Sequence, residues 1–140
     1  MRYYIIEPEV SISLGEGSVL STATHPPTIE KLDLIFEGWL GDDILETFPC
    51  FFVTEKLKRL IQFNNLSQVE FEEISIIKSD ALLEFNIQKK IPKIYLLKIS
   101  GEAKINDFGV SKDNLLIVSE LCLKVLKQSN VNHCDIEEIS

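Results

Sequence analysis

Residues 39–46, with the sequence WLGDDILE, bring together the side chains best suited to chemistry or binding. Trp39 is the only tryptophan, and three acids follow it at Asp42, Asp43 and Glu46. An aromatic side chain with charged neighbours is typical of a binding hot spot. The alternative is structural, because the single tryptophan of a small domain is usually at least partly buried. We therefore predict Trp39, Asp42, Asp43 and Glu46 as candidate binding residues, with a role in the core and its cap as the alternative.

Adjacent carboxylates are also candidate metal ligands. Asp42 and Asp43 could bind a divalent cation, and a small metal-dependent hydrolase could use Asp42, Asp43 or Asp107. Two neighbouring acids without further ligands do not define such a site. The triplet Asp107-Phe108-Gly109 matches the kinase metal-binding motif in letters only, and we predict a turn that carries Phe108 into the core. We expect no catalytic residue, no metal and no cofactor.

Cysteine and histidine are the other residues that could act as ligands or nucleophiles. The three cysteines, Cys50, Cys122 and Cys134, have no C-x-x-C spacing. His133 precedes Cys134, but adjacent residues of a strand point to opposite faces, which makes a poor catalytic pair. We therefore predict that the cysteines fill the core and that His133 lies at the surface.

The net charge of −8 is concentrated at the start of the 140-residue chain. Residues 1–50 contain two bases and nine acids, a net charge of −7, whereas residues 51–140 contain 12 bases and 13 acids. Such a surface repels nucleic acid and attracts a basic partner. No apolar run reaches the roughly 18 residues of a membrane span, and the first residues do not resemble a signal peptide. We expect a cytoplasmic protein that does not enter a membrane.

Two segments, residues 50–75 and 115–140, align without a gap at an offset of 65 residues (115 − 50), with seven identical positions. In each, an apolar run leads into Thr54 or Ser119, which predicts a strand followed by a capped helix. A stretch ending in Glu-Glu-Ile-Ser then predicts a second strand. The alignment therefore predicts two similar strand-helix-strand units. It also places each cysteine where the other segment has an aliphatic residue.

The rest of the pattern predicts three more strands, over residues 3–7, 32–37 and 93–99. It also predicts a long loop over residues 11–28 and a short helix over residues 81–85. Strands and helices do not alternate regularly, and no linker or low-complexity tract divides the chain. This favours a single α+β domain over residues 1–140, with a mixed β-sheet covered by two or three helices.

Residues 37–54, EGWLGDDILETFPCFFVT, resemble a phrase of small acidic bacterial immunity proteins from polymorphic-toxin systems, including antitoxins of type VI secretion and Rhs-type effectors. Residues 107–109 and 116–120 are similar to a second phrase, with Asn106 where those proteins carry an acid. The resemblance implies a cytoplasmic antitoxin that binds and blocks the C-terminal domain of a cognate toxin. It also implies that the tryptophan and the two aspartates of the first phrase lie at that interface.

Three functions are therefore open. The leading one is inhibition by binding, in which the acidic first 50 residues dock on a basic toxin surface of the nuclease or ADP-ribosyltransferase class. The second is a metal-dependent hydrolase that uses Asp42, Asp43 or Asp107. The third is a non-catalytic module that self-associates through an exposed strand. In the leading case, the two aligned segments form the scaffold that holds the acidic region.

Overall fold

The structure is a computed structural model in which residues 2–25, 27–74, 76–78 and 92–139 are described. Its helices are α1 (Glu55–Phe63) and α3 (Glu120–Leu126). Its strands are β1 (Tyr3–Glu7), β2 (Ile12–Leu14), β3 (Val19–Ser21), β4 (Thr28–Lys31), β5 (Leu34–Phe36), β6 (Ile44–Thr47), β7 (Cys50–Thr54), β8 (Val69–Glu73), β9 (Ile76–Lys78), β10 (Ile94–Ile99), β11 (Phe108–Val110), β12 (Leu116–Ser119) and β13 (Asp135–Glu138). None of the described helices is long and apolar enough to cross a membrane.

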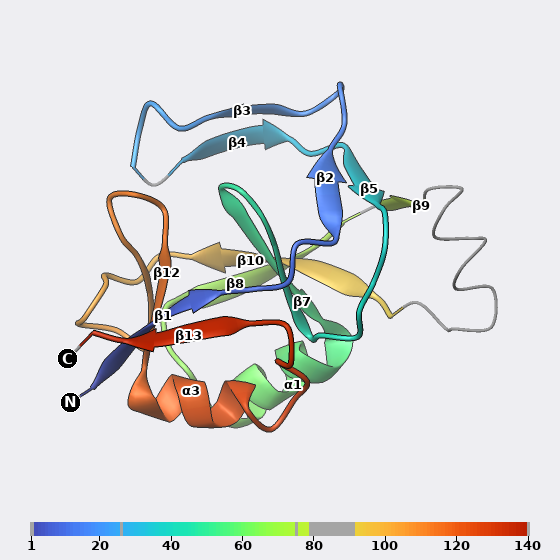
Figure 1. Ribbon diagram of the computed structural model, residues 1–140. Helices are drawn as coiled ribbons and strands as arrows, with labels where there is room; N and C mark the ends of the chain where they lie inside the picture. The colour runs from blue at the N-terminus through green and yellow to red at the C-terminus, as the bar shows by residue number, and fades with distance from the viewer. Residues whose placement is uncertain (1, 26, 75, 79–91, 140) are drawn as a thin grey trace.

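Two four-stranded antiparallel sheets form the body of the molecule. Sheet A has the strand order β11-β12-β1-β13, and sheet B has the order β6-β7-β10-β8. A smaller sheet, β2-β5-β9, contains the parallel pair β5–β9. The β3–β4 hairpin extends at the end of the molecule opposite the helices (Figure 1). The chain is thus a small α+β domain with mostly antiparallel sheets.

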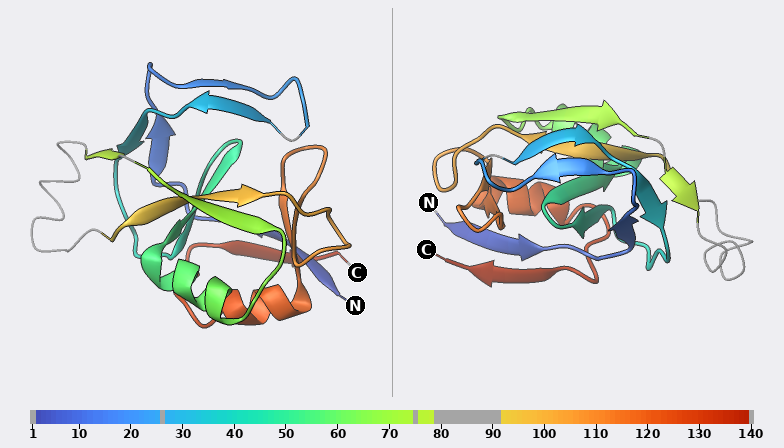
Figure 2. Two further views of the ribbon diagram at one scale, coloured as in Figure 1. Left: turned by 180° about the vertical axis from the view of Figure 1, so that it is seen from behind. Right: turned by 90° about the horizontal axis from the view of Figure 1, so that it is seen from above.

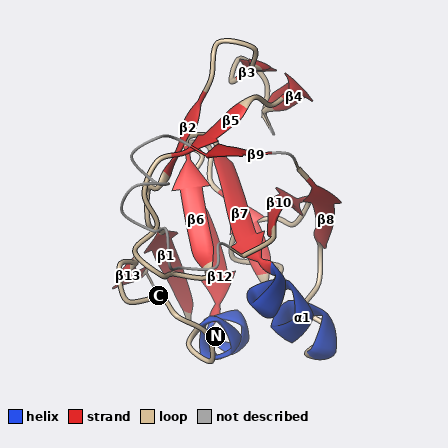
Figure 3. Ribbon diagram, turned by 90° about the vertical axis from the view of Figure 1, so that its right-hand side faces the viewer, coloured by secondary structure: helices blue, strands red, loops and turns tan. Residues whose placement is uncertain are grey.

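The two helices lie at the same end of the molecule, below the sheets, and contact each other (Figures 2 and 3). Thr54 caps α1, since its Oγ1 accepts a hydrogen bond from the N–H of Leu57 at 3.4 Å. Ser119 caps α3 in the same way, with the N–H of Cys122 at 3.1 Å from its Oγ. Both predicted caps are confirmed, and each satisfies a backbone donor that the first turn leaves unpaired.

The two aligned segments each run through a strand, a helix and a strand, but the two strands of a segment do not pair with each other. β10 lies between β7 and β8, and β1 lies between β12 and β13. Each segment depends on a strand from elsewhere in the chain for its ladder hydrogen bonds. The prediction of two similar strand-helix-strand units over 50–75 and 115–140 is therefore not confirmed, because neither segment is complete without that third strand.

The N-terminal region contains more regular structure than its sequence predicts. Residues 11–28, expected to form a loop, contain β2 and β3 and lead into β4. The serine and glycine residues of this segment are typical of loops, so its sequence does not predict these short strands. Ile12 is nevertheless buried opposite Phe36 of β5. The short helix predicted over residues 81–85 lies outside the described residues.

Buried side chains form two clusters. The larger joins both helices to sheets A and B and includes Leu57, Phe108 and Leu126. The smaller joins β2 and β5 to sheet B and includes Phe36 and Phe52. Phe108 is fully buried, as predicted, although it begins β11 and not a turn.

Two of the three cysteines belong to this core. Cys50 and Cys122 are buried, whereas Cys134 is half-buried. Burial raises the pKa of Cys50 to about 11 and raises that of Cys122 well above its usual value. The predicted core-filling role is confirmed for these two thiols, and neither is prepared to act as a nucleophile.

Replacement of Phe108 by alanine is expected to lower the free energy of unfolding by about 3–5 kcal/mol, because it removes a buried ring and leaves a cavity. The matched control is Phe63→Ala, since Phe63 is 86% exposed, and its effect should stay within about 0.5 kcal/mol. Urea denaturation followed by Trp39 fluorescence measures both. Equal losses in the two variants would contradict the placement of Phe108 in the core.

Candidate functional site

Asp43 is a buried carboxylate that joins two elements distant in the sequence. Its Oδ1 accepts a hydrogen bond from Thr54 Oγ1 at 2.7 Å, and its Oδ2 accepts one from the N–H of Asn130 at 2.7 Å. Its backbone carbonyl also accepts from the N–H of Thr54 at 3.0 Å. Lys56 Nζ lies 3.9 Å from Oδ2. Asp43 therefore fixes the N-cap of α1 and the loop after α3 at one point.

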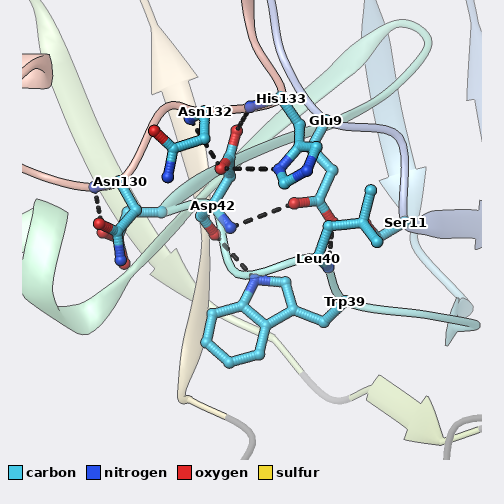
Figure 4. A network of polar contacts seen from close by, with 9 residues as sticks. Glu9, Ser11, Trp39, Leu40, Asp42, Asn130, Asn132 and His133 are labelled. Atoms are coloured by element: carbon cyan, nitrogen blue, oxygen red, sulfur yellow. Dashed lines mark hydrogen bonds and ion pairs between the residues drawn. The ribbon is translucent and has the colours of Figure 1, made fainter. Parts of the chain in front are cut away.

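Asp42 is fully buried and holds the same loop from another side. Its Oδ1 accepts from the N–H of Asn132 at 2.9 Å, and its Oδ2 accepts from the N–H of His133 at 2.7 Å. Nδ1 of the His133 ring lies 3.3 Å from Oδ1, which gives an ion pair when the ring is protonated. Figure 4 shows Asp42 between this loop and Glu9. The two adjacent aspartates thus point to different groups and together hold residues 130–133.

Glu9 is a second buried carboxylate beside Asp42 and is 3% exposed. It accepts hydrogen bonds from the N–H of Leu40 at 2.9 Å, from the N–H of Asp42 at 3.1 Å and from the hydroxyl of Ser11. Burial raises the pKa of Glu9, and the Asp42 carboxylate adds to the rise, whereas the two backbone donors and His133 oppose it. Two buried carboxylates therefore lie next to one half-exposed imidazole.

Trp39 closes this network from below in Figure 4. Its indole Nε1 donates to the carbonyl of Asp42 at 2.8 Å, and the half-buried ring packs against the smaller core cluster. The geometry matches the structural alternative for Trp39, a side chain that covers the core and positions a neighbouring turn.

Glu9, Asp42 and His133 form a group of potential metal ligands, in which one atom from each lies within 4.8 Å of the others. Every oxygen of the two carboxylates already accepts a hydrogen bond from an N–H group. Asp43 and Asp107 do not belong to the group, the one of its kind among the described residues. The structure therefore does not bring together Asp42, Asp43 and Asp107, the set considered for a hydrolase.

Asp107 does for α3 what Asp43 does for α1. Its Oδ1 accepts from Ser119 Oγ at 2.9 Å, and its Oδ2 accepts from the N–H and the hydroxyl of Ser67, both at 3.2 Å. Its carbonyl accepts from the N–H of Ser119 at 2.9 Å. Asp43 thus joins the start of α1 to the loop after α3, and Asp107 joins the start of α3 to the loop after α1.

A pocket of about 470 Å³ opens beside this network. Four of its lining residues are acids, one is a histidine, and none is a lysine or an arginine. Val10 and Leu40 add aliphatic surface and are 74% and 62% exposed. The complete lining, called the acidic pocket below, is Glu7, Pro8, Glu9, Val10, Leu40, Glu46, Leu115, His133 and Asp135.

The acidic pocket carries negative charge that no ion pair among the described residues balances. Glu7 of β1 lies directly opposite Asp135 of β13, and like charges in that position are destabilising. Burial raises the pKa of Glu46, and the Glu7 carboxylate raises it further. Burial followed by the charges of Asp42, Asp135 and Glu46 raises the pKa of Cys134 to about 12. None of the ion pairs among the described residues involves Glu7, Glu46 or Asp135.

The structure separates the four predicted site residues. Glu46 lines the acidic pocket, and Trp39 lies half-buried beneath the neighbouring network. Asp42 and Asp43 are 0% and 4% exposed, and their carboxylates hold the loop that carries His133. Their role at an interface stays a prediction, although both carboxylates are buried. The physical reason for the burial is that backbone donors from a loop near the end of the chain enclose both carboxylates.

Of the residues that line the acidic pocket, sequence reasoning predicted only Glu46, and the acids that it missed are Glu7, Glu9 and Asp135. A signal for the two glutamates was present in the acid excess of the first 50 residues. Nothing in the sequence placed Asp135 opposite Glu7, because that neighbourhood follows from the pairing of β1 with β13.

No family model and no curated protein matches the sequence. The two four-stranded sheets nevertheless offer a comparison within the chain. Tyr4 of β1 lies opposite Glu138 of β13, and Tyr95 of β10 lies opposite Glu73 of β8. The register continues in step along both pairs of strands. Positions of sheet A can therefore be matched with positions of sheet B.

At the acidic pocket the strand register still matches between sheets A and B, but the charges of the matched residues differ. Glu7 opposite Asp135 corresponds to Lys98 opposite Glu70, so two acids stand where sheet B has a base and an acid. In sheet B, Lys98 forms an ion pair with Glu72 at 3.8 Å, whereas the two acids in register at the pocket repel each other.

Two further acids, Glu46 of the pocket and Asp42 beside it, have neutral counterparts elsewhere in the chain. Glu46 occupies the register position on β6 that Val110 occupies on β11. Asp42 corresponds to Asn106, since each precedes the aspartate that binds a helix N-cap. The same type of junction is thus built without excess charge elsewhere in this chain, so the fold itself does not require the acids.

Asp42→Asn is expected to lower the free energy of unfolding by about 1–3 kcal/mol, because the amide nitrogen of asparagine cannot accept from a backbone N–H. Hydrogen exchange should become faster at the amides of Asn132 and His133. The control is Asp113→Asn, an exposed acid, whose effect should stay within about 0.5 kcal/mol. Unchanged hydrogen-exchange protection of the amides of residues 132 and 133 would contradict the role of Asp42 in holding this loop.

Glu46→Gln is expected to make the free protein more stable at neutral pH. The pKa of Glu46 is raised above the usual 4.5, so the folded chain favours the protonated form and ionisation reduces stability. Below the usual value, the carboxyl is protonated in the folded and unfolded states alike, and the difference between parent and variant should vanish. Thermal unfolding of both proteins between pH 4 and pH 8 measures it.

Glu7→Gln provides the control, because it removes one cause of the raised pKa of Glu46. The gain from Glu46→Gln should therefore be smaller in the Glu7→Gln background. A Glu46→Gln protein that is less stable than its parent at pH 7 would show that the charge is compensated.

Proposed function

We propose that this chain is an immunity protein that binds and blocks the C-terminal domain of a cognate bacterial toxin in the cytoplasm, and so protects the producing cell. The observation that carries the proposal is the acidic pocket, which combines four acids and no lysine or arginine with two strongly exposed aliphatic side chains. The resemblance of residues 37–54 to immunity proteins supports the same function. Inhibition by binding requires no catalytic group.

The unbalanced charge favours a binding role. Glu7 lies opposite the acid Asp135 and raises the pKa of Glu46, and a basic partner would relieve this repulsion. Complementary charge also speeds the encounter of two proteins and rejects partners of the same sign. The toxins proposed are therefore those with a basic surface, such as a nuclease or an ADP-ribosyltransferase, which bind anionic substrates.

The apolar part of the pocket fits the usual anatomy of an interface. Val10 and Leu40 expose aliphatic surface in a pocket that four acids also line. Interfaces commonly have an apolar centre and a polar rim. In this proposal Glu46 contacts the partner, while Trp39 and its two neighbouring aspartates hold the site in shape.

We also infer that the two strand-helix-strand segments are related halves, each completed by a strand from outside it. The ion pair of Arg2 and Glu138, at 3.7 Å, has its counterpart in that of Lys93 and Glu73, at 3.0 Å. The N–H of the first helical residue donates to the carbonyl of Arg2 in one half and of Lys93 in the other. The matched caps and strand registers support the same relation.

The open reading frame beside this gene is the first candidate toxin. Its expression alone should arrest growth, and co-expression of this chain should restore growth and yield a complex on size-exclusion chromatography. The triple variant Glu7→Gln, Glu46→Gln, Asp135→Asn should lose rescue. Its control with the same charge change, Glu16→Gln, Glu30→Gln, Glu102→Gln, should retain it. Growth arrest that the parent protein leaves unchanged would contradict the proposed function.

A further inference from the structure

The acidic pocket has features that define the chemistry of its ligand. The carboxylates of Glu7, Glu46 and Asp135 come from three different strands, and all three line one pocket. Glu9 lines it as well, but its carboxylate is already bound by backbone donors. Three acids on different strands therefore remain to receive a cation.

The shape of the pocket indicates what kind of cation fits. Pro8, Val10, Leu40 and Leu115 give it an apolar wall next to the acids. A small hydrated ion gains nothing from such a wall. A side chain with an aliphatic stem and a charged head uses both parts, because the stem covers apolar surface while the head meets the carboxylates.

The number of carboxylates favours arginine over lysine. A guanidinium group is planar and has five N–H donors, so it can bind more than one carboxylate and can bind one of them in a bidentate manner. The ammonium group of lysine is a compact, strongly hydrated charge with three donors. Glu7 and Asp135 face each other across two strands, and Glu46 comes from a third strand.

We propose that the acidic pocket binds one arginine side chain of a protein partner, with the guanidinium group between Glu7, Glu46 and Asp135 and the stem along Val10 and Leu40. This deepens the proposed function, since it assigns the chemistry that a toxin surface must present. It rests on the proposed function only for the identity of that partner.

The counterpart junction supports the assignment. There, Lys98 of this chain lies opposite Glu70, where the pocket has Glu7 opposite Asp135. In one half, the chain supplies its own cation at this register position. In the other half, the position of the cation is taken by an acid, and no ion pair among the described residues balances it.

The test is a titration of the ¹⁵N-labelled full chain, prepared free of metal, with the tripeptide acetyl-Gly-Arg-Gly-amide. Amide shifts are expected to concentrate on residues of the pocket, with Val10, Leu40, Glu46 and Asp135 among them. The same tripeptide with citrulline, which has a similar shape and no charge, should cause no such shifts. The lysine tripeptide should bind more weakly than the arginine tripeptide.

Two variants with equal charge change separate the pocket from general acidity. Glu7→Gln, Glu46→Gln, Asp135→Asn should weaken arginine binding by about tenfold or more, because the charge-assisted hydrogen bonds are lost. It should remain folded, since the changes remove repulsion, and its thermal unfolding verifies this. Glu16→Gln, Glu30→Gln, Glu102→Gln should stay within about twofold of the parent, because net charge alone contributes little at physiological salt.

Three results would overturn the assignment. Equal binding of the citrulline tripeptide would show that charge is not recognised, and equal weakening by both triple variants would show that binding is not local. A parallel titration with Mg²⁺, Mn²⁺ or Zn²⁺ that moves the same amides at lower concentration would show a cation site at Glu9, Asp42 and His133. Arginine binding without rescue from the toxin would instead contradict the immunity function and leave the pocket assignment intact.

Discussion

The structure depends on two aspartates that each bind a helix N-cap and a loop from the other half of the chain. Asp43 joins Thr54 to Asn130, and Asp107 joins Ser119 to Ser67. A carboxylate taken out of water is stable only when hydrogen-bond donors replace its solvent, and both aspartates accept from a hydroxyl and a backbone N–H. Asp43 therefore joins the start of α1 to the loop after α3, and Asp107 joins the start of α3 to the loop after α1. The helices and the sheets above them are positioned together.

These contacts explain how much of the molecule could be predicted. Thr54 and Ser119 could be identified as helix caps, because capping depends on residues three apart in the sequence. The buried state of Asp42 and Asp43 could not, because their donors lie in the loop of residues 130–133. Strand order was equally out of reach: β1 pairs with β12 and β13 from the far end of the chain, and no local pattern encodes such pairing.

Asp42 extends the clamp of Asp43 and connects it to the acidic pocket. By holding the N–H groups of residues 132 and 133, it places His133 at the pocket wall. Glu9 binds the N–H of Asp42 and lines the pocket from another side. Two of the acids predicted as binding residues, Asp42 and Asp43, are therefore buried beneath the acidic pocket and do not line it. Of the three acids predicted, only Glu46 lines the pocket.

The contacts and charges of the acidic side chains bear differently on the three functions considered for this chain. A hydrolase centred on Asp42 would need carboxylate oxygens that are open to a metal, whereas each one already accepts from a backbone donor. Self-association through a strand edge is opposed on β13, where Asp135, Glu137 and Glu138 are exposed acids. Inhibition by binding needs what the pocket provides, namely charge that the fold does not balance. Lys98 and Val110 occupy the positions of Glu7 and Glu46 in the other half, so this junction can be built without the excess charge, and this supports the proposal of a basic partner.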